Sequence, residues 1–254
     1  MLSQSQRDRI DIVLVSPRNP LNIGAVARAM ANFGFAHLTV VAPYGPHWRE
    51  ARSAVGAPEL LQNAKETETL ALAVASCTFV AGTGTLTHRK PEQPVIFLPD
   101  SAPTLTQRLD RGGRIALVFG PEKHGLTRDD LSYCHVLIEI PTDPGQPSMN
   151  LGQAVAVCLY ELACRALPAS HQAATDADSS APSATLDLLA GLIEKTMTAA
   201  GYSPRTMQPA NRRDLRLLLR RLAPSALDTR RMLGLFRRIL WRINHSPGSN
   251  ESPR

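Results

Sequence analysis

Three short segments of this 254-residue chain contain side chains that could bind and activate a polar substrate. They are Asn22–Arg28 (NIGAVAR), Phe119–Gly125 (FGPEKHG) and Pro147–Gly152 (PSMNLG). Together they offer a permanent cation, a carboxylate, a hydroxyl, two amides and several glycines. A cation can hold a phosphate or stabilise an oxygen that gains negative charge, and glycines leave the backbone open to a ligand.

Arg28 is the cation of the first segment, and it shares a helix face with Gly24 and Asn32 at intervals of four residues. A glycine one turn before an arginine lets another backbone or a substrate approach closely. Most arginines on a polar helix face are solvated surface residues. The guanidinium stays protonated, so it is suited to orienting a phosphate and not to removing a proton.

Ser148 and Asn150 precede a predicted helix in the third segment. Both residue types are good helix caps, and a helix N-terminus also attracts anionic groups. No histidine has a spacing that would make Ser148 a nucleophile of the Ser-His-acid type. The two side chains can therefore cap the helix, face a ligand, or do both.

Glycines also follow two predicted strands, at Gly82-Thr-Gly84 and at Gly120. A lone Gly-x-Gly is usually only a turn. Two such positions at neighbouring strand ends would allow the backbone to approach a flat ligand such as adenine.

Short apolar runs alternate with amphipathic segments along residues 10–165. This alternation indicates an α/β fold, with a parallel sheet that has helices on both faces. Ligands of such sheets bind at the carboxyl ends of the strands, where all three segments lie. The expected strands are residues 10–15, 37–41, 78–81, 114–119 and 136–140. The expected helices run from an N-cap at Asn22 to Gly34, over 67–76 and 102–111, from the Thr127/Asp130 capping box, and over 151–162.

In this order and setting, the three segments resemble the motifs of the SPOUT superfamily of RNA methyltransferases. The resemblance covers about residues 10–167, and within the superfamily it is to the TrmH-type 2′-O-methyltransferases that act on tRNA. It implies S-adenosylmethionine as the cofactor, a deep trefoil knot near the C-terminal end of the α/β domain, and a homodimer. General topology rules argue against a knot, so this expectation rests on the resemblance alone.

The resemblance also assigns roles to individual residues. Arg28 is expected to orient and activate the ribose hydroxyl in its own or the partner's pocket, and Glu122 to hold the loops or the substrate. Proton removal is left open between Ser148, water and the phosphate. The expected catalytic residues are Arg28, Ser148, Asn22, Glu122 and Asn150. The expected cofactor contacts are Thr83, Gly84, Thr85, Gly120, Ile140, Pro147, Ser148 and Met149.

The surplus of positive over negative charge lies entirely in the last quarter of the chain. The formal net charge is +6, but residues 186–254 carry 13 Lys/Arg against 5 Asp/Glu, and residues 1–185 carry 15 against 17. A near-neutral body with a basic appendage suggests that the appendage binds a polyanion, and a solvated basic face without a partner is the alternative. The resemblance favours tRNA as this partner.

We expect an α/β methyltransferase domain over 1–167, a flexible linker over 168–185 that is rich in Ala, Ser, Asp and Pro, and a small all-α domain over 186–254. Its helices are expected over 186–200, 210–222 and 228–244. Trp241 could stack on a base or pack internally. A membrane-surface helix is the rival interpretation, disfavoured because the apolar faces suit each other. The expected RNA-binding arginines are Arg212, Arg216, Arg220, Arg237 and Arg238.

Several classes of protein are disfavoured. No apolar run approaches the roughly 20 residues of a membrane span, and no signal-peptide pattern is visible. The four cysteines form no CxxC pair, so we expect no metal, buried thiols and a cytoplasmic location. The reaction that the resemblance implies is 2′-O-methylation of the cytidine or uridine at the start of the tRNA anticodon loop. The alternatives are rRNA methylation, an inactive RNA-binding protein, and a nicotinamide dehydrogenase. The last is remote, because this chain has no GxGxxG motif after its first strand.

Overall fold

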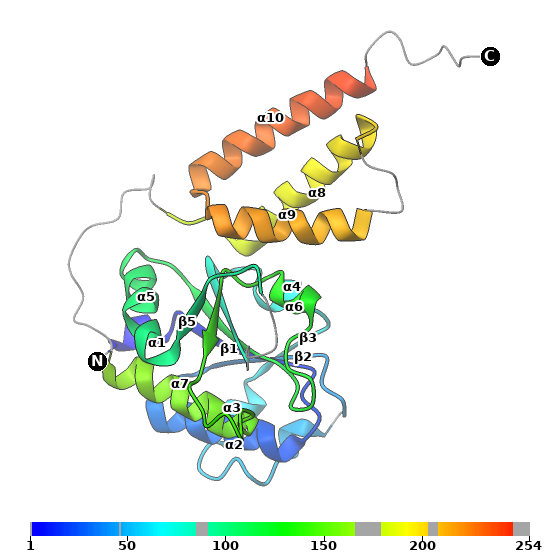
Figure 1. Cartoon of the computed structure of the whole chain (residues 1–254). Helices are drawn as coiled ribbons and strands as arrows, with labels where there is room; N and C mark the ends of the chain where they lie inside the picture. The colour runs from blue at the N-terminus through cyan, green and yellow to red at the C-terminus, as the bar shows by residue number, and fades with distance from the viewer. Residues whose placement is uncertain (1, 46, 85–90, 166–178, 203–207, 246–254) are drawn as a thin grey trace.

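The computed structural model describes residues 2–45, 47–84, 91–165, 179–202 and 208–245. Within these ranges, seven strands form one sheet in the order β3-β2-β1-β6-β4-β7-β5, and every neighbouring pair is parallel. The expected parallel α/β fold is therefore confirmed (Figure 1). The strands are β1 (Ile10–Val15), β2 (His37–Val41), β3 (Lys65–Thr67), β4 (Phe79–Thr83), β5 (Val95–Phe97), β6 (Ile115–Phe119) and β7 (Val136–Glu139).

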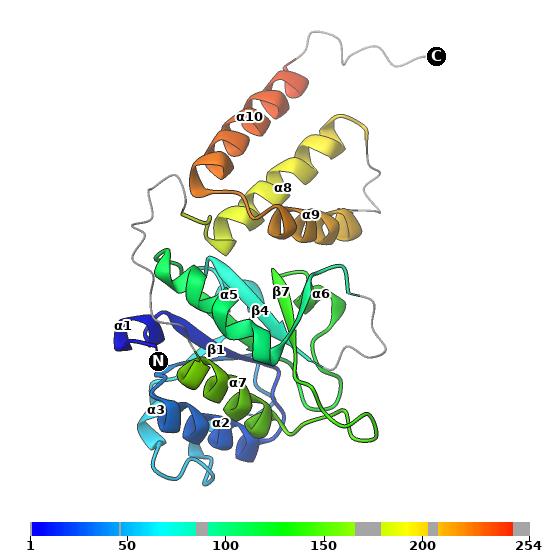
Figure 2. The same ribbon diagram turned by 60° about the vertical axis from the view of Figure 1, so that its left-hand side comes forward.

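Helices cover both faces of the sheet, because successive strand residues point to opposite sides. In β1, Ile12 and Leu14 join one buried cluster and Val13 and Val15 join another. The first cluster is completed by α2 (Pro20–Phe33), α3 (Pro58–Gln62), α5 (Leu98–Asp110) and α7 (Leu151–Arg165). The second is completed by the short helices α4 (Leu70–Ala73) and α6 (Arg128–Leu131) (Figures 1 and 2).

The start of α2 differs from the expectation. Asn19, not Asn22, is the N-cap, and its side chain accepts a hydrogen bond from the Leu21 N–H. Pro20 occupies the first helical position, where a missing N–H has no cost. Asn22 therefore lies inside the first turn with its amide free for another contact. The expected C-cap is correct, with Gly34 in the left-handed region at φ 74°.

Other differences concern short elements. Residues 67–76, expected to be one helix, contain the end of β3 and the four-residue α4. Gly82 and Thr83 belong to β4 and not to the expected turn. The sequence pattern does not predict β5, α1 (Gln4–Arg7), the 3₁₀ turn at Trp48–Glu50, or α3. Elements of three to five residues contain too few positions to show a hydrophobic period.

Three further helices form a layer beside the α/β body, on the side of α4 and α6 (Figures 1 and 2). They are α8 (Ser183–Ala199), α9 (Gln208–Leu222) and α10 (Ala226–Asn244), and a small apolar cluster around Leu189 and Leu219 joins them. The first begins earlier than the expected Leu186. Residues 168–178 of the expected linker, and the C-terminal residues from 246, lie outside the described residues. Among the helices of the described ranges, none is long and apolar enough to cross a bilayer.

Candidate active site

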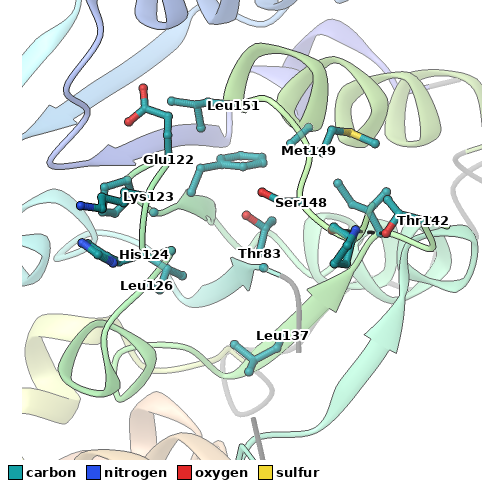
Figure 3. Close-up of a pocket in the computed structure, with 18 of the residues that line it drawn as sticks. Thr83, Glu122, Lys123, His124, Leu126, Leu137, Thr142, Ser148, Met149 and Leu151 are labelled. Atoms are coloured by element: carbon teal, nitrogen blue, oxygen red, sulfur yellow. Dashed lines mark hydrogen bonds between the residues drawn. The ribbon is translucent and has the colours of Figure 1, made fainter. Parts of the chain in front are cut away.

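A pocket of about 270 Å³ opens where β4, β6 and β7 end. The loops that follow these strands surround it, together with the segment before α7 (Figure 3). This is the edge of a parallel sheet at which ligands generally bind. Of the expected cofactor contacts, the pocket is lined by Thr83, Gly84, Gly120, Ile140, Pro147, Ser148 and Met149. Thr85 lies outside the described residues.

The loop after β6 is folded back tightly on itself at Gly120. A Cβ atom there would lie 2.3 Å from the Leu126 nitrogen and 2.4 Å from the Gly125 carbonyl carbon. The Gly125 N–H donates to the Pro121 oxygen at 2.8 Å and closes the turn. No residue with a side chain fits at position 120 unless this pocket wall moves.

The hydroxyl groups that line the pocket differ in availability, and that of Thr142 is already used, because it donates to the Pro147 oxygen at 3.3 Å. The hydroxyl of Thr83 is buried and donates to the Val118 oxygen at 3.1 Å, so it holds two strands together. Ser148 is exposed, and its hydroxyl has no hydrogen-bond partner among the residues that the structure describes. Figure 3 shows Thr83, Ser148 and Met149 around the same pocket. Ser148 is therefore the hydroxyl that remains available to a ligand.

One chain of hydrogen bonds joins all three sequence segments. The Asn22 amide donates to Glu122 Oε1 at 2.7 Å, and the Asn150 amide donates to Asn22 Oδ1 at 3.0 Å. The Asn150 oxygen in turn accepts from the Gly152 N–H at 2.9 Å and caps α7. Asn22 and Asn150 thus fix the loop of Glu122 against the starts of two helices.

Partial burial acts to raise the pKa of Glu122, but hydrogen bonds from Asn22 and from backbone N–H groups outweigh it. The pKa therefore lies below its ordinary value. Glu122 remains a carboxylate at neutral pH and is a poor proton acceptor for a substrate hydroxyl. Its geometry and charge suit it to hold the site together.

Arg28 lies apart from this pocket in its own chain. It is exposed on α2, does not line the pocket, and makes no hydrogen bond or ion pair with the described part of the chain. Gly24, one turn earlier, serves packing: a Cβ there would lie 2.1 Å from Ser53 Oγ and 2.8 Å from the Ala54 nitrogen. The close approach expected at this glycine is made by the chain itself and not by a ligand.

Several pocket residues were missed by the sequence analysis. Lys123 and His124 follow Glu122 in the same segment and line the pocket. The sequence contains no recognisable spacing that would mark either residue as functional. The apolar part of the wall comes from leucines that read as ordinary core residues in the sequence. These are Leu126, Leu131, Leu137 and Leu151.

Arg216 and Arg220, expected to bind RNA, are paired within the protein in this structure. Arg216 has a side chain that is 10% exposed and pairs with Asp129, and Arg220 is 1% exposed and pairs with Asp187 at 3.0 Å. Arg212 is about half exposed and pairs with Glu194 at 2.6 Å. These arginines face neighbouring helices because the apolar stripe of α9 is flanked by carboxylates of α6 and α8.

By contrast, Arg237 and Arg238 are exposed on α10 and have no ion-pair partner within the described ranges. Trp241, 57% exposed, stacks on His245 with 4.7 Å between ring centroids. These side chains therefore remain accessible to a partner from solvent.

No cluster of three or more His, Cys, Asp or Glu side chains with metal-binding geometry occurs in the described part of the chain. The cysteines are free thiols, and Cys77, Cys134 and Cys158 are buried as expected, whereas Cys164 is exposed. Burial raises the pKa of Cys134 to about 12, so this thiol is not ionised at neutral pH.

The fold and the pocket at its strand ends match a known class of enzyme. The model of the SpoU rRNA methylase family matches residues 9–160. The match covers more than half of the chain, which therefore belongs to the SpoU rRNA methylase family. The resemblance to SPOUT methyltransferases of the TrmH type is thereby confirmed.

The individual relatives within this family that match the chain well are enzymes called TrmJ. The chain is 32% identical to the tRNA (cytidine/uridine-2′-O-)-methyltransferase TrmJ of Pectobacterium atrosepticum, over 92% of this chain and 95% of that protein. It is 40% identical to the tRNA (cytidine/uridine/adenosine-2′-O-)-methyltransferase TrmJ of Pseudomonas aeruginosa, where the match spans only 61% of this chain and 60% of that protein. The crystal structure of TrmJ from Z. mobilis ZM4 superposes with a TM-score of 0.78 at 32% identity, over 90% of this chain and 98% of that one.

Proposed function

We propose that this chain transfers a methyl group from S-adenosylmethionine to a ribose 2′-hydroxyl of tRNA. The target that we propose is the cytidine or uridine at the start of the anticodon loop. The observation that carries the proposal is the similarity to TrmJ enzymes over more than nine-tenths of both chains, which includes the C-terminal helices.

The residues of the pocket fit the proposed cofactor. Apolar side chains such as Leu137 and Ile140 suit an adenine ring, and the free Ser148 hydroxyl offers a polar contact. At Gly84 a Cβ would meet no atom of the described residues within 4 Å, so the backbone there can approach a ligand, and the same contact is proposed for Thr85. S-adenosylmethionine would supply the electrophilic methyl group, and the chain would bind and orient it.

Arg28 is proposed to orient the ribose and to stabilise the negative charge that develops on its oxygen. Because Arg28 does not line the pocket of its own chain, we infer that it serves the pocket of a second copy. A homodimer, built through the knotted domain of this family, is thus part of the proposal. Asn22, Glu122 and Asn150 would hold the loops in place while Ser148, water or a phosphate takes the proton.

The C-terminal helices, residues 186–254, are proposed as a tRNA-binding domain beside a methyltransferase domain of residues 1–167. The exposed Arg237 and Arg238 of α10 support this role, with Trp241 available to stack on a base. Arginines that are already paired inside the protein are not part of this surface.

Methylation of rRNA is a second candidate, because the family description itself names rRNA methylases. Mass spectrometry of tRNA from a strain that lacks the gene tests the first proposal, and we expect one ribose methyl group to be missing. Assays of the purified chain on tRNA and rRNA transcripts separate the two substrates. Binding of S-adenosylmethionine, measured by calorimetry, separates both from an inactive RNA-binding protein.

A further inference from the structure

The contact between α9 and the α/β body is made by two arginines around one tyrosine. The Arg216 guanidinium lies 4.2 Å from the centroid of the Tyr133 ring, donates to its hydroxyl at 2.6 Å, and pairs with Asp129. Arg220 donates to the Tyr133 carbonyl oxygen at 2.9 Å and to Asp187 of α8 at 3.0 Å. Both guanidinium groups are withdrawn from solvent, although the Asp129 carboxylate is 67% exposed, so the contact rests on the hydrogen bonds to Tyr133 as well as on the ion pairs.

The part of the body that receives these arginines is the short helix α6 and its last turn. Asp129 lies within α6, and Tyr133 follows its C-cap. A four-residue helix has too few hydrogen bonds to be stable by itself, so its position depends on what packs against it. The capping box of Thr127 and Asp130 fixes its start, Arg216 pairs with Asp129 in its first turn, and both arginines contact Tyr133 just beyond its end.

The same helix forms a wall of the candidate cofactor pocket. Leu126 and Leu131, immediately before and within α6, both line the pocket. Leu126 also lies against the tight turn at Gly120, where a Cβ would be only 2.3 Å from its nitrogen. A displacement of α6 would therefore reach the loop that surrounds the ligand, because Gly120 and Leu126 are packed without room for one added carbon at position 120.

We propose that docking of α9 through Arg216 positions α6 and thereby sets the affinity of the pocket for its ligand. Arg216 is a positioning residue in this arrangement, since it acts through Asp129 and Tyr133 and does not touch the pocket. The inference rests on the proposed function for the identity of the ligand, S-adenosylmethionine. By thermodynamic linkage, the ligand must in return strengthen the docking of α9.

The test is calorimetric titration of the full-length chain and of its Arg216→Ala variant with S-adenosylmethionine. Coupling energies carried through packed side chains correspond to a roughly two- to thirtyfold change in affinity, and we expect the Kd to rise within this range. Arg221→Ala is the matched control: it removes the same charge from the same helix at an exposed position, and its Kd should equal that of the native chain.

Hydrogen exchange provides a second measurement that a merely structural role would not change. S-adenosylmethionine should slow the exchange of the α9 amides in the native chain and in Arg221→Ala, but not in Arg216→Ala. If Arg216→Ala fails to fold by circular dichroism, Tyr133→Phe replaces it, because it removes only the hydroxyl that accepts from Arg216. A folded variant with the native Kd and native α9 protection overturns the inference. Failure of the native chain itself to bind S-adenosylmethionine overturns the proposed function.

Discussion

The helices α9 and α10 are both rich in arginine, but their arginines lie in opposite environments. Both are amphipathic and both carry arginines at helical spacing. In α9 the guanidinium groups of Arg216 and Arg220 are buried in ion pairs, whereas in α10 those of Arg237 and Arg238 face solvent. An arginine stripe therefore does not by itself indicate a polyanion site. What decides its use is whether carboxylates and aromatic rings of other elements lie opposite the stripe.

Among substitutions in the two helices, we expect the largest loss of stability from replacing Arg220. Replacement by alanine leaves Asp187, whose side chain is 26% exposed, and the Tyr133 carbonyl oxygen without their partner. Removing one partner of a fully buried ion pair costs about 3–5 kcal/mol, and because water reaches Asp187 we expect a decrease of about 3 kcal/mol in urea unfolding. Arg238→Ala on α10 should change the free energy of unfolding by less than about 0.5 kcal/mol. Equal effects of the two substitutions would remove the distinction between the helices.

Arg28 is an exposed arginine like those of α10, and its role is proposed to be functional. Arg28→Ala should lower the rate of methyl transfer by about 10²–10³-fold, the usual effect of removing a group that stabilises a developing oxyanion. The Kd for S-adenosylmethionine, measured by calorimetry, should stay nearly unchanged. An equal decrease in rate and in cofactor affinity would contradict the proposed role.

Burial and the nearby charge of Arg220 both affect the pKa of His135. Burial lowers the pKa of His135 to about 3, and the charges of Arg220 and Arg108 contribute to this decrease. The unfolded chain binds a proton at this histidine below about pH 6.5, and the folded chain does not, so stability should fall as the pH decreases from 6.5 toward 3, by up to about 1.4 kcal/mol per pH unit.

Urea unfolding at several pH values measures this slope. His135→Asn keeps an acceptor for the Val80 N–H, which donates to Nδ1 at 3.1 Å, but it cannot bind the proton. The variant should lose less stability between pH 6.5 and 4 than the native chain. Identical slopes would show that the histidine titrates alike in both states.

The smallest expected effect is that of the α10 surface on RNA. Replacing both Arg237 and Arg238 by alanine should weaken tRNA binding and lower the salt slope by about one for each phosphate that is no longer neutralised. Fluorescence anisotropy over a range of salt concentrations measures both quantities. An unchanged salt slope would mean that α10 is a solvated basic face without a partner. Arg221→Ala on α9 is the control, because it removes an exposed charge outside α10.

Long periodic segments were predicted from the sequence, and contacts between distant segments were not. The strands Ile10–Val15 and His37–Val41 were found with their correct bounds, because buried parallel strands are continuous apolar runs bounded by turn residues. The pocket was located because parallel strands place their carboxyl ends together. Neither the apolar runs nor the position of the strand ends predicts which side chains of different helices make contact.

Asn22 and Arg216 show the physical reason. Asn22 was predicted to be a helix cap from its neighbours, but Pro20 and Asn19 begin the helix and leave its amide for Glu122, 100 residues away. Arg216 was assigned to RNA because Asp129, 87 residues away, was not known to lie opposite it. Both outcomes depend on partners that only the folded chain brings together.

The hydrogen-bond chain from Glu122 through Asn22 to Asn150 affects when the pocket forms during folding. Its members are 100 and 128 residues apart in the sequence, so each contact closes a large loop. Contacts of such long range form late, since the entropy of closing the loop must be offset by the rest of the sheet. A ribosome-bound chain that has not yet released Asn150 cannot assemble the pocket, and binding competence should arise in a single late step of folding.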